Sequence, residues 1–207
     1  MKTRRKSAFR NALRDHGIAG AWGFAEATFF FVVPDVWTSW VGLRRPKRAL
    51  GTTVSALGGA LAGGTVTYWW GSKVAANTSR NALGKVPAVT DVMISAVEQE
   101  IAGSGAASIL RGPIRGVPYK LYARAAGLQR TPLAAFLAWS VPGRMIRFMV
   151  VTGAVSGIAA AGRRRFPGLS ERSISAVFWI CWGAFYAVFI PLKSRRGSIS
   201  AQQFTRT

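Results

Sequence analysis

The sequence predicts an all-α polytopic membrane protein, with two opposed re-entrant helical hairpins and about three transmembrane helices in an inverted-repeat-like arrangement. Half of the 207 residues are hydrophobic, and uncharged blocks at 49–71 and 173–192 can each cross about 30 Å of hydrocarbon. Many of the 28 Lys and Arg residues lie beside the apolar blocks, which is where the cytoplasmic bias of basic residues and their attraction to anionic lipids would put them. Two further apolar segments, 17–43 and 106–128, are broken by proline and carry charge. We therefore expect a single transmembrane domain at 17–192.

The first hairpin is expected at 17–43, after a basic cytoplasmic tail at 1–16. Its only charged residues are Glu26 and Asp35, and Pro34 interrupts it. The segment is too short for two crossings of about 20 residues each, and both of its ends are basic, which favours a hairpin that enters and leaves on the cytoplasmic side. A single crossing is the alternative.

Glu26 and Asp35 are candidate residues for transport and proton coupling. An ionisable group in lipid costs about 2.5–3.5 kcal/mol on insertion scales, so such residues usually mark functional sites. The alternatives are a structural salt bridge for Glu26 and a helix cap for Asp35.

A transmembrane helix is expected at 49–71, where Gly59 and Gly63 form a small-residue stripe that permits close approach of another helix. The segment 86–102 then keeps helical spacing of apolar residues after Pro87. It predicts an amphipathic helix that lies on the surface. An ordinary helix in a soluble loop is the alternative.

The second hairpin is expected at 106–128, entering from the outer side. Glycine and proline interrupt this segment at 112, 113, 116 and 118, and it is basic. Transmembrane helices at 132–162 and 173–192 follow, the first with Gly153 and Gly157 as a second small-residue contact, and a basic tail at 193–207 ends the chain. A full crossing at 106–128 is the alternative, and it would move this tail to the cytoplasm.

Several basic residues are candidates for binding an anionic headgroup or pairing with the acids. Arginine forks and a lysine point charge suit a phosphate, and arginines three positions apart share one helical face. Their alternative roles are packing against the acids and extending to the interface. The candidates are Arg111, Arg115, Lys120, Arg144 and Arg147.

Two motifs resemble the DedA/VTT superfamily, also called SNARE-associated Golgi proteins. "EATFFFVVPD" is similar to that family's first hairpin, and "GPIRGVPYKLYARAAGL", followed by "GRMIRF", is similar to its second hairpin and the next span, particularly in the YqaA-like branch. The resemblance implies two opposed re-entrant hairpins and transport of phospholipid or polyprenyl-phosphate lipids, in some members coupled to protons.

The same resemblance implies roles for individual residues. Glu26 and Asp35 would match the family's acidic pair. Lys120 lies near the position of its second-hairpin arginine, and Arg111 or Arg115 could match the other basic position. We accordingly expect a flippase-like transporter that moves a lipid with an anionic headgroup between leaflets of the bacterial inner (plasma) membrane, with protons as the candidate coupling ion.

Other function classes find less support in the residues. The net charge of +21 is not accompanied by an aromatic-interleaved basic motif, so no nucleic-acid partner is expected. A single cysteine and a single histidine favour neither a metal site nor a cofactor. A membrane enzyme that acts on lipid phosphates would need a nucleophile or base. That enzyme and a non-catalytic membrane scaffold are the alternatives, and the sequence leaves the oligomeric state open.

Overall fold

The computed structural model describes the backbone of residues 2–168 and 170–204. It describes the side chains of residue 6 and of residues 9–168 and 170–192. Every regular element in these ranges is a helix, so the predicted all-helical class is confirmed. The side chains of the predicted basic tail at 193–207, and much of the start of the tail at 1–16, lie outside the described residues. The elements are α1 (Lys2–Thr28), α2 (Asp35–Arg44), α3 (Pro46–Lys73), α4 (Ala76–Gly84), α5 (Asp91–Ser104), the 3₁₀ helix η1 (Gly105–Leu110), α6 (Arg111–Arg115), α7 (Tyr119–Leu128), α8 (Leu133–Arg165) and α9 (Glu171–Phe204).

Three helices in the described part of the chain are long and apolar enough to cross a membrane. They are α3, α8 and the portion of α9 from Glu171 to Leu192. Their positions agree with the three spans predicted at 49–71, 132–162 and 173–192. By the length and composition of these helices, the described chain is therefore a membrane protein.

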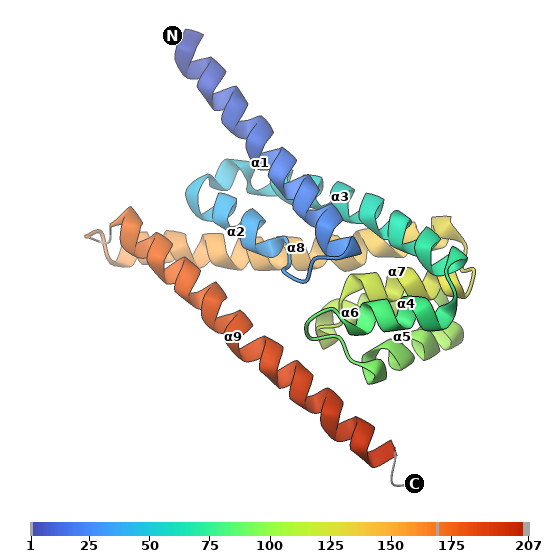
Figure 1. The fold of residues 1–207 in the computed structure, drawn as a ribbon. Helices are drawn as coiled ribbons and strands as arrows, with labels where there is room; N and C mark the ends of the chain where they lie inside the picture. The colour runs from blue at the N-terminus through green and yellow to red at the C-terminus, as the bar shows by residue number, and fades with distance from the viewer. Residues whose placement is uncertain (1, 169, 205–207) are drawn as a thin grey trace.

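Helix α3 lies at the centre of the bundle, with α1 along one side and α7 along another (Figure 1). A Cβ atom at Gly59 would collide with the backbone of Gly20, and one at Gly63 with the backbone of Phe24. The close helix approach predicted from these two glycines is confirmed, and its partner is α1. The contact predicted at Gly153 and Gly157 is wrong for the described residues, because no described atom lies within 4 Å of where their Cβ atoms would be.

The first helix break lies between α1 and α2. Helix α1 runs without interruption from Lys2 to Thr28, since no proline lies before position 34. The part of the predicted first hairpin that precedes Pro34 is therefore continuous with the basic tail. The chain then turns, and Pro34 caps the start of α2, where a missing N–H costs nothing. The Trp22 indole donates to the Val32 carbonyl at 3.0 Å, which fixes the turn to α1.

The second helix break separates η1 and α6 from α7. Gly116 adopts a left-handed conformation (φ 63°), which glycine reaches without steric cost, and Pro118 then starts α7. The segment predicted as one surface helix at 86–102 instead becomes helical only at Asp91. Thr90 caps it by accepting from the Met93 N–H at 3.3 Å, and Ile94, Val97 and Ile101 are buried inside the protein.

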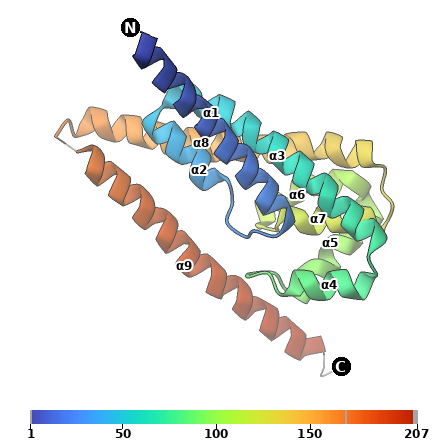
Figure 2. The same cartoon turned by 45° about the horizontal axis from the view of Figure 1, so that its top comes forward.

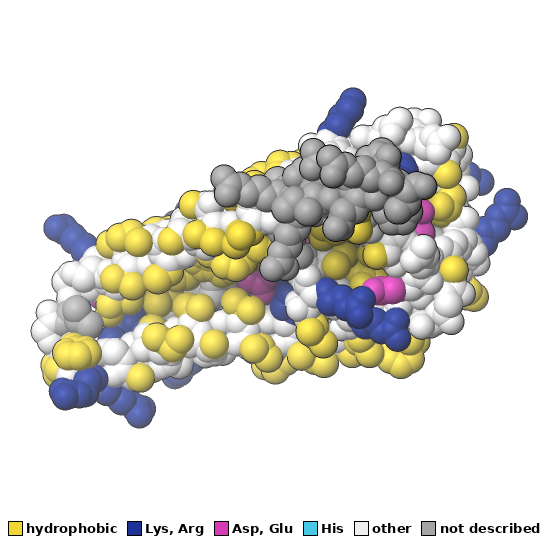
Figure 3. Space-filling model, turned by 90° about the horizontal axis from the view of Figure 1, so that it is seen from below, with side chains coloured by type: hydrophobic (Ala, Val, Ile, Leu, Met, Phe, Trp, Pro, Cys, Tyr) yellow, Lys and Arg dark blue, Asp and Glu magenta, His cyan; other side chains and the backbone are white. Residues whose placement is uncertain are grey.

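Helices α8 and α9 share a turn at one end and diverge from it in a V (Figures 1 and 2). Most of α9 therefore has little cover from the rest of the chain, and its large apolar side chains such as Ile180 and Val188 are exposed. From below, apolar side chains extend over the half of the molecule next to the shared turn, and basic side chains stand at its end (Figure 3). An exposed apolar helix surface of this kind is expected to face lipid.

Candidate functional site

The Glu26 carboxylate forms an ion pair with the Arg144 guanidinium in the middle of the bundle. Glu26 lies in the last turn before the first helix break, and Arg144 lies in α8. Each side chain is only 4 % exposed. The guanidinium also lies over the rings of Tyr119 and Phe148, at 4.5 and 5.0 Å from their centroids. A buried arginine held by one carboxylate and two aromatic faces is oriented with little freedom.

A second ion pair joins Asp35, the first residue of α2, to Arg147, one helical turn after Arg144. Arg147 Nη2 lies 2.9 Å from Asp35 Oδ2, and the aspartate side chain is 2 % exposed whereas that of the arginine is 24 % exposed. A buried hydrogen bond of 2.8 Å between Thr152 and Thr38 holds α8 against α2 at this level. The predicted acidic pair therefore meets the predicted arginine pair from α8.

Both ion pairs leave polar atoms without partners. Among the described residues, Asp35 Oδ1 and the Nε atoms of Arg144 and Arg147 are buried and accept or donate no hydrogen bond. Unsatisfied buried polar atoms are rare in proteins and usually indicate water, an ion or a functional role. These atoms therefore leave both ion pairs with unused hydrogen-bonding capacity.

Lys120 connects the two helix breaks directly. Its side chain is fully buried, and Nζ donates to the carbonyl oxygen of Phe30 at 2.6 Å. Phe30 belongs to the turn between α1 and α2, and Lys120 belongs to the first turn of α7. The turn of the first break is thus held by a cation from the second.

Two tyrosines complete the site and were not singled out from the sequence. Tyr119 stacks on Arg144 and donates to Ser140 at 2.9 Å, and the hydroxyl of Tyr186 accepts from the Val33 N–H at 2.9 Å. Tyr186 belongs to α9, and the ring of Phe31, from the turn between α1 and α2, packs edge-on against it. A tyrosine among many aromatic residues gives no sequence signal of its own, because its role depends on which break it faces.

Two small cavities lie at the ion pairs. One, of about 30 Å³, is lined by Glu26, Lys120 and Tyr186, and the other, of about 20 Å³, by Tyr119, Arg144 and Arg147. Each has room for about one water molecule. Glu26 thus lines one cavity and its partner Arg144 lines the other.

The structure places the remaining predicted basic residues away from this cluster. Arg115 pairs with Glu100 of α5 and its side chain is 61 % exposed, while Arg111 reaches Ser104 at 3.4 Å on the exposed surface. A different residue of that segment, Arg124, is buried, where it pairs with Glu98 and donates to Ser79 at 2.9 Å. Arg124 ties α7 to α4 and α5, which is a structural role.

The described residues contain no group of three or more His, Cys, Asp or Glu side chains that could hold a metal ion. The candidate site is instead made of two carboxylates, two guanidinium groups and one ammonium. Comparisons of the chain with protein-family models, with curated proteins and with solved structures found no match.

Proposed function

We propose that this protein is a multi-pass transporter of the bacterial inner (plasma) membrane that moves a phospholipid or polyprenyl-phosphate-type lipid between leaflets. In this proposal the segments around the two helix breaks are re-entrant hairpins, as the resemblance to the DedA/VTT superfamily implies. Glu26 and Asp35 exchange protons, and the arginines of α8 bind the anionic headgroup.

The observation that carries the proposal is the buried Glu26–Arg144 ion pair, in which Glu26 lines one small cavity and Arg144 lines another. Inverted-repeat transporters place their sites where broken helices meet near the middle of the membrane. A charge pair between two cavities can act as a gate, because access from one cavity to the other requires the pair to open.

The chemistry of the pair supports competition between a proton and an anion. Arg144 and Arg147 can offer their Nη2 groups to a phosphate only when Glu26 and Asp35 release them. Protonation neutralises a carboxylate and weakens its hold on the guanidinium. A bound headgroup and a protonated acid therefore favour the same open arrangement, which couples lipid to proton.

The cavities are too small for a lipid headgroup, so the structure corresponds in this proposal to an occluded state. Opening requires the first break to move away from the second, with loss of the hydrogen bond from Lys120 to Phe30.

The test is transport in reconstituted vesicles. Vesicles that contain the purified chain would carry fluorescent phosphatidylglycerol or a labelled polyprenyl phosphate, and movement between leaflets would be read from dithionite quenching or enzymatic accessibility. Glu26→Gln and Asp35→Asn should abolish transport. Asp15→Asn is the matched control, because Asp15 is also a buried, arginine-paired acid but lies outside the site.

Full transport by both acid variants would contradict the proposal. So would release of inorganic phosphate from the labelled lipid, since that would make the chain an enzyme acting on lipid phosphates.

A further inference from the structure

An open cleft of about 330 Å³ lies between α8 and α9, next to their shared turn. Val155 and Ile158 of α8 line one wall, Val177 and Trp182 of α9 line the other, and Leu43 at the end of α2 closes the base. Among the residues that line it, only Arg163 is charged, and the other polar side-chain groups are the hydroxyl of Ser173, the thiol of Cys181 and the indole N–H of Trp182. None of the candidate transport residues lines this cleft.

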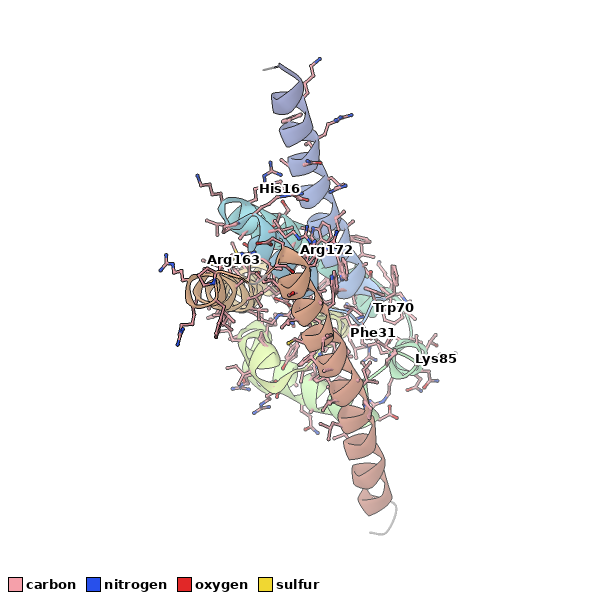
Figure 4. The ribbon with its side chains drawn as sticks, turned by 90° about the vertical axis from the view of Figure 1, so that its left-hand side faces the viewer. His16, Phe31, Trp70, Lys85, Arg163 and Arg172 are labelled. Atoms are coloured by element: carbon pink, nitrogen blue, oxygen red, sulfur yellow. The ribbon has the colours of Figure 1, made fainter. Side chains whose placement is uncertain are left out.

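The end of the cleft at the turn is strongly basic. Arg163 lines the cleft, donates to the Leu43 carbonyl at 3.2 Å and pairs with Glu171 at 2.9 Å. Arg44 approaches this end of the two helices from α2, where it donates to Ser175 of α9 at 2.9 Å, although neither residue lines the cleft. Figure 4 labels Arg163 and Arg172 at this end of the two helices. The segment 163–172 contains four arginines and a single acid, Glu171.

We propose that the cleft binds one anionic phospholipid of the surrounding bilayer, with an acyl chain between α8 and α9 and its phosphate at Arg163 and Arg44. The apolar walls suit a hydrocarbon chain, because a polar ligand would lose its hydrogen bonds to water there without replacing them. The arginines at one end can bind a phosphate through charge-assisted hydrogen bonds. This arrangement of an apolar slot with cations at one end matches a lipid with an anionic headgroup.

The charge at the end of the cleft favours a lipid over an apolar helix of a second protein. The phosphate of a lipid would meet Arg163 there, whereas an apolar helix would bring no anion to this end. An acyl chain is much thinner and can enter without separating α8 from α9. The bound lipid would then serve as a wedge that fixes α9 to the bundle, and this role does not rest on the proposed transport.

Two glycines of α8 provide a matched pair of variants. Neither Gly162 nor Gly157 has a described atom within 4 Å of the place where a Cβ would be, so both accept a side chain. Gly162 lines the cleft, whereas Gly157 belongs to a separate surface hollow beside Arg164 and Arg165. Gly162→Phe should therefore fill the cleft and Gly157→Phe should not.

Cys181, the single cysteine of the chain, lines the cleft and reports its occupancy. The full chain in detergent micelles would be alkylated with a maleimide in the presence of phosphatidylglycerol or phosphatidylcholine. At a phosphatidylglycerol concentration ten times its dissociation constant, the alkylation rate should fall about tenfold by mass action. Phosphatidylcholine should protect far less, and Arg163→Gln should remove this difference while Arg111→Gln keeps it.

The two glycine variants locate the site. Phosphatidylglycerol should raise the thermal unfolding midpoint of the wild type and of Gly157→Phe, but not that of Gly162→Phe. Equal protection of Cys181 by both lipids would overturn the recognition of an anionic headgroup. A stabilisation of Gly162→Phe equal to that of the wild type would overturn the location. If, without added lipid, Cys181 became better protected from alkylation as the protein concentration rose, the cleft would be assigned to a second copy of the chain. That result would overturn the proposal.

Discussion

Glu26 and Arg144 stand 118 positions apart in the sequence and form an ion pair in which each side chain is only 4 % exposed. Loss of one partner from a buried pair leaves an uncompensated charge, which typically costs 3–5 kcal/mol. We expect Glu26→Gln and Arg144→Gln each to lower the thermal unfolding midpoint by roughly 6–20 °C. Unfolding followed by tryptophan fluorescence in detergent would measure this.

The double variant Glu26→Gln, Arg144→Gln should be more stable than either single variant, because it removes both charges together. Glu171→Gln is the control, since the Glu171–Arg163 pair lies in the exposed turn between α8 and α9 and its loss should leave the midpoint nearly unchanged. Additive losses in the double variant would show that the two charges do not stabilise one another.

Lys120 is expected to hold the first helix break closed. Its hydrogen bond to the Phe30 carbonyl involves a charged donor, and such bonds contribute about 1.5–3 kcal/mol. In Lys120→Met the backbone amides of residues 29–33 should exchange with deuterium at least roughly tenfold faster than in the wild type. Mass-spectrometric hydrogen exchange would measure this.

Lys85→Met is the matched control for Lys120→Met, because Lys85 is an exposed residue at the end of α4 (Figure 4) and makes no hydrogen bond to the turn among the described residues. Unchanged exchange at residues 29–33 in Lys120→Met would mean that the lysine does not restrain the break.

The sequence predicted the large features of the fold because each rests on a local signal. Spans come from the length of apolar runs, and the two helix breaks come from Pro34 and from the close succession of Gly116 and Pro118. A proline alone does not decide a break, because Pro142 lies inside the continuous helix α8. The start of α1 was missed because a basic segment can be either a helix or a tail. The sequence alone offered no reason to choose between them.

The candidate site was predicted in part. Both acids are buried and both meet arginines of α8, but the sequence could not show that Arg111 and Arg115 point to α5 and the surface. Whether these two arginines face the site depends on how η1 and α6 pack against α8, and this packing cannot be read from the sequence. The same dependence on packing hid Tyr119 and Arg124.

Transport rates of variants should distinguish the role of the arginines of α8 from that of the arginines of α6. Arg147→Gln leaves Asp35 buried without its cation and removes a candidate headgroup donor, so the initial rate in vesicles should fall at least roughly tenfold. Arg111→Gln, on the exposed surface, should keep the wild-type rate. A loss of transport in Arg111→Gln with full activity in Arg147→Gln would place the headgroup site at α6 instead of α8.

Close packing of α1 on α3 depends on the absence of a side chain at Gly59. A Cβ there would meet the backbone of Gly20, and backbone cannot move aside as the end of a flexible side chain can. We expect Gly59→Leu to separate the two helices and to destabilise the fold by at least about 1–3 kcal/mol, the usual cost of overpacking. Gly58→Leu introduces the same side chain one position earlier, where no described atom lies within 4 Å, and should leave the unfolding midpoint close to that of the wild type.

Because α1 carries Glu26, Gly59→Leu should also weaken the coupling between Glu26 and Arg144 in a double-mutant cycle. Equal midpoints for the Gly58 and Gly59 variants would show that α1 does not lie against this face of α3.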